Sequence, residues 1–150
     1  MARVTRKREI EAPVAAVWKL VSDPYSLPRW WPRTARVENV DAKPGGKRTA
    51  WTKVLQTAEG RGVRADFRCV SSAEGERYVW EQELEGTPFE RHLNALRVEI
   101  GLRERGEATE VSLTEEQTLK GMSKFGSPLM RRARREILDE ALDGLERSLS

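Results

Sequence analysis

The stretch "IEAPVAAVWKLVSDPYSLPRWWP" at residues 10–32 decides how the rest of the chain is interpreted. Pro13 suits the first turn of a helix, and apolar residues then recur at helical spacing as far as Asp23. Asp23 followed by Pro24 is typical of the start of a second helix, which the two later prolines keep short. We therefore expect two short helices here, preceded by a strand over residues 3–11.

The middle of the chain changes to period-two alternation interrupted by turn residues. Turns that contain glycine, such as "KPGGK" at residues 43–47, separate the apolar runs. The pattern predicts six strands, over residues 34–42, 47–56, 61–71, 76–84, 88–104 and 107–119. Because strand follows strand with no helix between them, we expect an antiparallel sheet, and a doubly wound parallel fold is excluded.

The final stretch, "GSPLMRRARREILDEALDGLERSLS" at residues 126–150, predicts one helix of about six turns. Ser127 suits the N-cap and Pro128 the first helical position. The apolar positions form one stripe that needs a large apolar partner, and the sheet is the only one available. The stripe comprises Leu129, Met130, Ala133, Ile137, Leu138, Ala141, Leu142, Leu145 and Leu149.

Length and composition favour one globular domain over residues 1–150. Apolar residues make up 38% of the chain and charged residues 34%, and no apolar run approaches the ~20 residues of a membrane span. We therefore expect a cytoplasmic protein without stable membrane insertion. Cys69 and His92 are the only cysteine and histidine, so we expect neither a metal nor another cofactor. A net charge of +3 gives no reason to expect a nucleic-acid partner.

The order of elements and the motif in residues 10–32 resemble the START-like (SRPBCC) superfamily. This superfamily includes birch-pollen-allergen-like proteins and the polyketide cyclase/dehydrase and lipid transport family. The motif consists of an Ala-Pro pair, Val17-Trp18, Asp23-Pro24 and the Trp-x-Pro of residues 30–32, and the hairpin "RGEATEVSLTEEQTLKG" before the last helix adds to the likeness.

The resemblance implies an α+β helix-grip fold. In this fold a curved seven-stranded antiparallel sheet surrounds a long C-terminal helix, with two short helices between strands 1 and 2. A cavity between the sheet and the helix is expected to hold a small hydrophobic molecule that is lipid-, aromatic- or polyketide-like. On this fold Trp30 and Trp31 lie near one end of the groove. One of them is expected to cover the sheet edge or the cavity mouth while the other faces a ligand; the alternative is that both only pack in the core.

Strict alternation predicts which side chains point toward the helix. The inward sets are Val63, Ala65, Phe67 and Cys69 in one strand, Tyr78, Trp80, Gln82 and Leu84 in the next, and Val111, Leu113, Glu115, Gln117 and Leu119 in the last. Two registers stay open for residues 88–104. Unbroken alternation turns Glu90, His92 and Asn94 inward, whereas a bulge near residue 94 or 95 turns Phe89, Arg91 and Leu93 inward.

Several polar residues at one end of the sheet favour a hydrated cavity lined by Gln82, His92, Glu115 and Gln117, although a solvent-exposed sheet end explains the same pattern. The segment at residues 119–130 either gates the cavity mouth or connects two elements. The predicted ligand-binding residues are Trp31, Phe67, Tyr78, Trp80, Gln82, His92, Gln117 and Met130.

Three functions remain open at this point. We favour non-enzymatic binding of a small hydrophobic ligand. A cyclase or dehydratase that uses His92 together with Glu115 or Gln117 is the enzymatic alternative. The third possibility is a protein-interaction domain that uses the basic run "RRARR" at residues 131–135. Acidic residues follow this run at i,i+4 spacing, so a solvated helix face explains it better.

Overall fold

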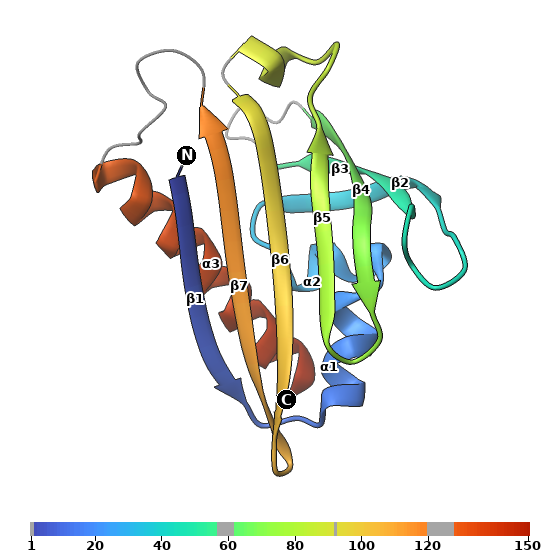
Figure 1. The fold of residues 1–150 in the computed structure, drawn as a ribbon, viewed down its shortest axis with the longest axis vertical. Helices are drawn as coiled ribbons and strands as arrows, with labels where there is room; N and C mark the ends of the chain where they lie inside the picture. The colour runs from blue at the N-terminus through green and yellow to red at the C-terminus, as the bar shows by residue number, and fades with distance from the viewer. Residues whose placement is uncertain (1, 57–61, 92, 120–127) are drawn as a thin grey trace.

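A curved seven-stranded antiparallel sheet packs against one long helix in the computed structural model of the protein (Figure 1). The structure describes residues 2–56, 62–91, 93–119 and 128–150. The strand order is β1-β7-β6-β5-β4-β3-β2. The elements are β1 (Ala2–Ile10), α1 (Val14–Val21), the 3-10 turn η1 (Pro24–Ser26), α2 (Leu27–Trp30), β2 (Thr34–Asp41), β3 (Ala50–Leu55), β4 (Val63–Ala73), β5 (Arg77–Glu83), the 3-10 turn η2 (Pro88–Arg91), β6 (Leu93–Arg105), β7 (Ala108–Leu119) and α3 (Pro128–Leu149).

The segment between β1 and β2 folds as its prolines predict. The Asp23 carboxylate accepts a hydrogen bond from the Tyr25 N–H at 3.0 Å, which caps η1, and Pro24 takes the first position. Helix α2 follows directly and ends at Trp30. Trp31 is extended because a residue that precedes a proline is disfavoured in the helical conformation. The side chains of Trp30 and Trp31 therefore leave the backbone in different directions.

The strand predicted over residues 88–104 is shorter than expected, because η2 occupies its first residues and β6 begins only at Leu93. Pro88 has no N–H group for a strand ladder. Local hydrogen bonds favour a turn instead: the Glu90 N–H donates to the Thr87 carbonyl at 3.1 Å, and the Gly86 N–H donates to the Glu90 carboxylate at 3.0 Å. Glu90 is exposed, so the inward orientation that unbroken alternation would give it, one of the two open registers, is wrong.

Helix α3 is buried along its second half only. Leu138, Ala141, Leu142 and Leu145 have no exposed surface. Gly144 allows α2 to approach, because a Cβ atom at this position would lie 2.3 Å from the Trp30 carbonyl oxygen. The apolar stripe does not continue to the start of the helix as predicted, since Leu129 is 75% exposed and Ala133 is also exposed. The first turns lie beside a cavity rather than on packed side chains, as described below.

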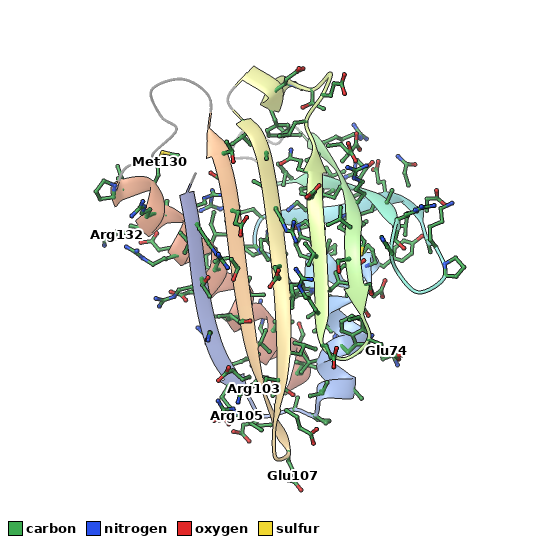
Figure 2. All side chains as sticks on the ribbon, viewed as in Figure 1. Glu74, Arg103, Arg105, Glu107, Met130 and Arg132 are labelled. Carbon is green, nitrogen blue, oxygen red and sulfur yellow. The ribbon has the colours of Figure 1, made fainter. Side chains whose placement is uncertain are left out.

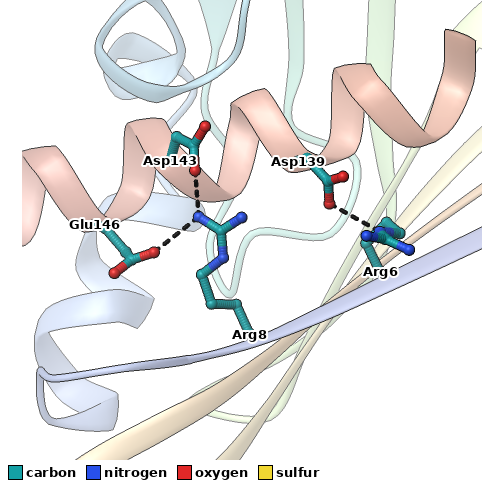
Figure 3. A network of polar contacts seen from close by, with 5 residues as sticks. All are labelled: Arg6, Arg8, Asp139, Asp143 and Glu146. Atoms are coloured by element: carbon teal, nitrogen blue, oxygen red, sulfur yellow. Dashed lines mark hydrogen bonds and ion pairs between the residues drawn. The ribbon is translucent and has the colours of Figure 1, made fainter.

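Ion pairs fix α3 to the edge strand β1 (Figure 3). The Arg6 guanidinium donates to Asp139 at 2.8 Å, and Arg8 donates to Glu146 at 2.8 Å and also to Asp143. All three carboxylates lie on the second half of α3. The inner side of this half is buried in the core. These contacts hold the helix against the sheet on the side where β1 ends the sheet.

The outer face of the sheet is charged. Arg77 and Glu99 pair across β5 and β6 at 2.7 Å, and this hydrogen bond lowers the pKa of Glu99. Figure 2 shows Arg103, Arg105 and Glu107 at one end of the molecule, while Met130 and Arg132 lie at the other end, on the first turns of α3. Within the described ranges, no helix is both long enough and apolar enough to cross a membrane. Because the outer face of the sheet is charged, the apolar residues of the sheet lie on its inner face, toward α3.

Candidate ligand-binding cavity

A cavity of about 340 Å³ lies between the sheet and the first half of α3. Its apolar lining comes from the segment after α2, from the four strands β3 to β6, from η2 and from α3. These residues are Trp31, Pro32, Leu55, Ala65, Phe67, Trp80, Phe89, Leu93, Leu96, Val98 and Ile137. Its polar lining consists of Arg33, Lys53, Gln82, Glu115, Gln117 and Arg134. The hollow is thus mostly apolar and contains a small set of groups that can form hydrogen bonds.

Alternation places several of the predicted residues around this cavity. Phe67 in β4, Trp80 and Gln82 in β5, and Glu115 and Gln117 in β7 line it together. Antiparallel pairing of β4 with β5 and of β6 with β7 brings these inward positions side by side. Val63 differs from the expectation: it is 38% exposed, because it is the first residue of β4 and lies at the end of the strand.

A bulge decides the register of β6. Leu93 pairs with Leu119, but Ala95 pairs with Thr118, so the ladder shifts between Leu93 and Ala95. An extra residue in one strand reverses the alternation on the side before the bulge. As a result Leu93 lines the cavity together with Leu96, and Phe89 of η2, which precedes the strand, lines it as well. The bulged register is therefore confirmed for these residues, and this end of the sheet is more apolar than unbroken alternation suggests.

The two adjacent tryptophans have different surroundings. Trp30 is buried against Gly144 of α3 and does not line the cavity. Trp31 lines it and contacts the edge of Trp80, with ring centroids 5.3 Å apart. Trp51 stacks on Phe67 at 6.1 Å behind this wall. Trp30 is thus core, as the packing alternative has it, and Trp31 belongs to the cavity wall. That Trp31 faces a ligand stays a prediction.

Lys53 of β3 is a cavity residue that sequence reasoning missed. It is only 7% exposed, and its Nζ lies 4.8 Å from the ring centroid of Phe67 and 5.5 Å from that of Trp31. Burial lowers the pKa of Lys53 to about 8, although the Glu115 carboxylate acts in the opposite direction. The signal was present in "AWTKVL", because Trp51, Lys53 and Leu55 alternate with the same period.

Glu115 is 4% exposed and is held by two donors. Its Oε1 accepts hydrogen bonds from Arg134 at 3.0 Å and from Gln117 at 3.3 Å. Its Oε2 is buried and has no hydrogen-bond partner among the described residues, and the same holds for the Nε2 of Gln82. Buried polar atoms in proteins are nearly always paired, so two unpaired ones in one apolar cavity indicate groups that can bind a ligand.

The basic run at the start of α3 is divided between two environments. Arg134 turns toward β7 and pairs with Glu115 across the cavity. Arg131, Arg132 and Arg135 are exposed, and Arg132 forms an i,i+4 ion pair with Glu136 at 3.4 Å. The run is therefore not a single solvated face, since one of its members belongs to the cavity.

Three predicted ligand-binding residues are not among those that line the cavity. Tyr78 lies farther along β5, where its ring meets the edge of Trp18 at 6.0 Å, and burial raises its pKa. Met130 is half-buried on the first turn of α3. His92 lies outside the described residues, as does most of the segment at residues 119–130. In the part of the chain that the structure describes, no three histidine, cysteine or acidic residues cluster in a way that could hold a metal ion.

Comparison with known proteins agrees with this architecture. The profile of the family described as "Polyketide cyclase / dehydrase and lipid transport" matches residues 1–150. No curated protein sequence matches the chain significantly.

Solved structures show the same fold. A START superfamily protein from Mycobacterium smegmatis aligns with a TM-score of 0.78 at 15% identity over 98% of this chain and 96% of that one. A protein from Thermus thermophilus aligns with a TM-score of 0.75 at 24% identity over 99% and 97% of the two chains. The di-domain ARO/CYC BexL from the BE-7585A biosynthetic pathway aligns with a TM-score of 0.76 at 19% identity over 98% of this chain and 46% of that one. With its helix-grip fold and its match over residues 1–150, the chain belongs to the polyketide cyclase/dehydrase and lipid transport family.

Proposed function

We propose that this protein binds a small, largely apolar molecule in the cavity between the sheet and α3. The observation that carries the proposal is a hollow of about 340 Å³ whose wall is mainly aromatic and aliphatic. This volume lies within the range of roughly 300–1,000 Å³ that is common for small-molecule sites. Family membership agrees with such a role, because the family's description includes lipid transport.

The unpaired polar atoms support the same proposal. Leaving a buried donor or acceptor unpaired costs about 1–3 kcal/mol. Gln82 and Glu115 each carry such an atom at the cavity. A ligand with an apolar body and one polar group would cover the wall and bond to these atoms at the same time.

Tryptophan fluorescence offers a direct test, because Trp31 and Trp80 line the cavity. We expect saturable changes in emission when the purified protein is titrated with members of a panel of fatty acids, flavonoids, sterols and flat polycyclic aromatics. Ala65→Met should fill part of the cavity and weaken binding at least about tenfold, since bulk introduced there displaces the ligand.

Ala35→Met is the matched control, because Ala35 is exposed on β2 and should leave binding unchanged. Far-ultraviolet circular dichroism would check that both variants are folded. A folded Ala65→Met protein with the affinity of the wild type would contradict the proposal.

A cyclase- or dehydratase-type enzyme is the second candidate, and Glu115 supports it. Glu115 lines the cavity, and its Oε2, which has no hydrogen-bond partner among the described residues, can accept a proton from a bound substrate. The similarity to a structure named as a di-domain ARO/CYC protein also supports this reading. In a substrate screen, Glu115→Gln should keep binding and lose turnover; a variant that converts substrate at the wild-type rate would remove Glu115 as the base.

A further inference from the structure

The charges around the cavity are unbalanced. Three cationic residues line it, namely Arg33, Lys53 and Arg134, whereas Glu115 is the one carboxylate among its described lining residues. Arg134 already pairs with Glu115 at 3.0 Å. Among the residues that the structure describes, no carboxylate oxygen lies within the 4.0 Å of an ion pair from the Lys53 Nζ. The positive charge of Lys53 is thus left without an anionic partner.

A buried ammonium group without such a partner is unusual, because charges inside proteins are normally paired. The Lys53 Nζ instead lies 4.8 Å and 5.5 Å from the ring centroids of Phe67 and Trp31. Aromatic faces attract a cation but do not neutralise it. Burial lowers the pKa of Lys53 to about 8, and the Glu115 carboxylate opposes this shift only in part. The cavity therefore has one strong electrostatic requirement that the described residues do not meet.

The apolar wall sets the other requirement. Trp31 and Phe67, whose rings lie next to the Lys53 ammonium group, also belong to the cavity lining together with Trp80. A molecule that satisfies both the wall and the ammonium group needs an apolar body that ends in an anion. The Gln82 Nε2 group, which has no partner, supplies a further donor for an anionic oxygen in the same cavity.

We infer that the ligand is an apolar carboxylic acid whose carboxylate pairs with the Lys53 ammonium group while its body lies against Trp31, Phe67 and Trp80. This inference rests on the proposed function, because it assumes that the cavity binds a ligand. It goes further by naming the class of ligand and the residue that selects it. Charge-assisted hydrogen bonds are about twice as strong as neutral ones, so an acid should bind better than an uncharged molecule of the same shape.

Isothermal titration calorimetry with matched pairs of probes tests the inference. The pairs are 2-naphthoic acid with 2-naphthylmethanol, and decanoic acid with decanol, all at pH 7. For the pair that fits the cavity, we expect the acid to bind wild-type protein at least about tenfold more tightly than the alcohol. In Lys53→Met, which keeps the apolar length of the side chain, we expect this preference to disappear while the alcohol still binds.

Lys19→Met is the matched control, because Lys19 is exposed on α1 and its replacement changes the net charge by the same amount. This variant should keep the preference for the acid. If Lys53→Met does not fold, Lys53→Gln removes the same charge and serves as the second variant.

The outcomes separate the inference from the function on which it rests. Equal binding of acid and alcohol to the wild type would overturn the inference and leave ligand binding intact. A preference that persists in a folded Lys53→Met protein would also overturn it. If none of these probes and no member of the fluorescence panel binds, the proposed function fails and the inference fails with it. Loss of the preference in Lys53→Met alone supports the inference.

Discussion

The two halves of α3 face the same curved sheet but have different surroundings. From Leu138 to Leu145 the inner side of the helix is fully buried, and Gly144 lets Trp30 approach. In the first half, Arg134 and Ile137 line a cavity instead. Strand β7 changes in the same way, since Val111 and Leu113 are apolar and fully buried while Glu115 and Gln117 are polar and face the hollow. One helix and one strand thus form both a core and a candidate binding site.

The difference indicates a division of labour along the groove. The filled half supplies most of the apolar contacts that stabilise the fold, since buried side chains in close contact dominate folding energetics. The cavity half lacks some of these contacts and contains the polar side chains of Lys53, Glu115 and Arg134. Substitutions in the filled half should therefore lower stability, whereas substitutions in the cavity half should alter electrostatics and binding.

Replacing a leucine in each half gives the largest expected contrast. Leu142→Ala should lower the free energy of unfolding by about 3 kcal/mol, because it creates a cavity in a fully packed region. Leu129→Ala should change it by less than about 0.5 kcal/mol, because that side chain is largely exposed. Urea unfolding followed by circular dichroism measures both values. If the two variants lost similar amounts of unfolding free energy, the two halves of α3 would not differ in their contribution to stability.

Lys53→Met should stabilise the protein near neutral pH. Burial lowers the pKa of Lys53 from its ordinary 10.5 to about 8, so the unfolded chain binds more protons between these values. Wild-type stability should therefore rise with pH from about 8 to 10.5 through this residue, and the protonated group costs stability below pH 8. At about 1.36 kcal/mol per pKa unit, the variant should gain about 3 kcal/mol at pH 7.

This gain over the wild type should shrink as the pH approaches 10.5. Glu115 and Arg134 are the charged groups that act on Lys53 from β7 and α3, and both remain in the variant. Denaturant unfolding of the two proteins at pH 7 and pH 10 would show the change, and a difference independent of pH would contradict it.

Two arginines of the basic run at residues 131–135 have different surroundings. Arg134→Met should cost about 1–3 kcal/mol, because it removes a donor from the buried Glu115 carboxylate. Arg132→Met should cost about 0.5 kcal/mol or less, because its ion pair with Glu136 is largely exposed. Thermal unfolding of the two variants at the same pH measures the difference. Equal shifts in Tm would mean that the hydrogen bond from Arg134 to Glu115 stabilises the protein no more than an exposed ion pair does.

The smallest effect is expected for the ion pairs between β1 and α3. Arg8→Gln should lower stability by about 0.5 kcal/mol at low salt, because its partners Asp143 and Glu146 are largely exposed. The difference from the wild type should fall toward zero in 1 M NaCl, where charges are screened within about 3 Å. A loss that does not depend on salt would indicate packing by the Arg8 side chain rather than charge.

Sequence patterns predicted the order of elements and part of the cavity, and the reason is physical. Alternation in a paired strand has a fixed period, so Phe67, Trp80 and Gln117 could be assigned to the inner face from their spacing alone. Turn η2 was missed because its local hydrogen bonds compete with the strand ladder, and alternation does not report on them.

Charged residues were harder to assign. Lys53 went unnoticed because a lysine is normally solvated, and the cost of burying one is not visible in periodicity. Arg134 could not be distinguished from its neighbours in "RRARR", since only the position of α3 relative to β7 selects it. The unpaired atoms of Gln82 and Glu115 likewise follow from three-dimensional contacts that no spacing encodes.

The pairing of β1 with β7 has a consequence for how the chain reaches this fold. Ala2 lies opposite Gln117 and Ile10 opposite Thr109, whereas β2 to β7 pair as successive neighbours. Contacts between residues so distant in sequence slow folding, because a long loop must close before they form. During synthesis on the ribosome, β1 therefore has no strand partner until β7 has emerged, and the sheet gains this edge last.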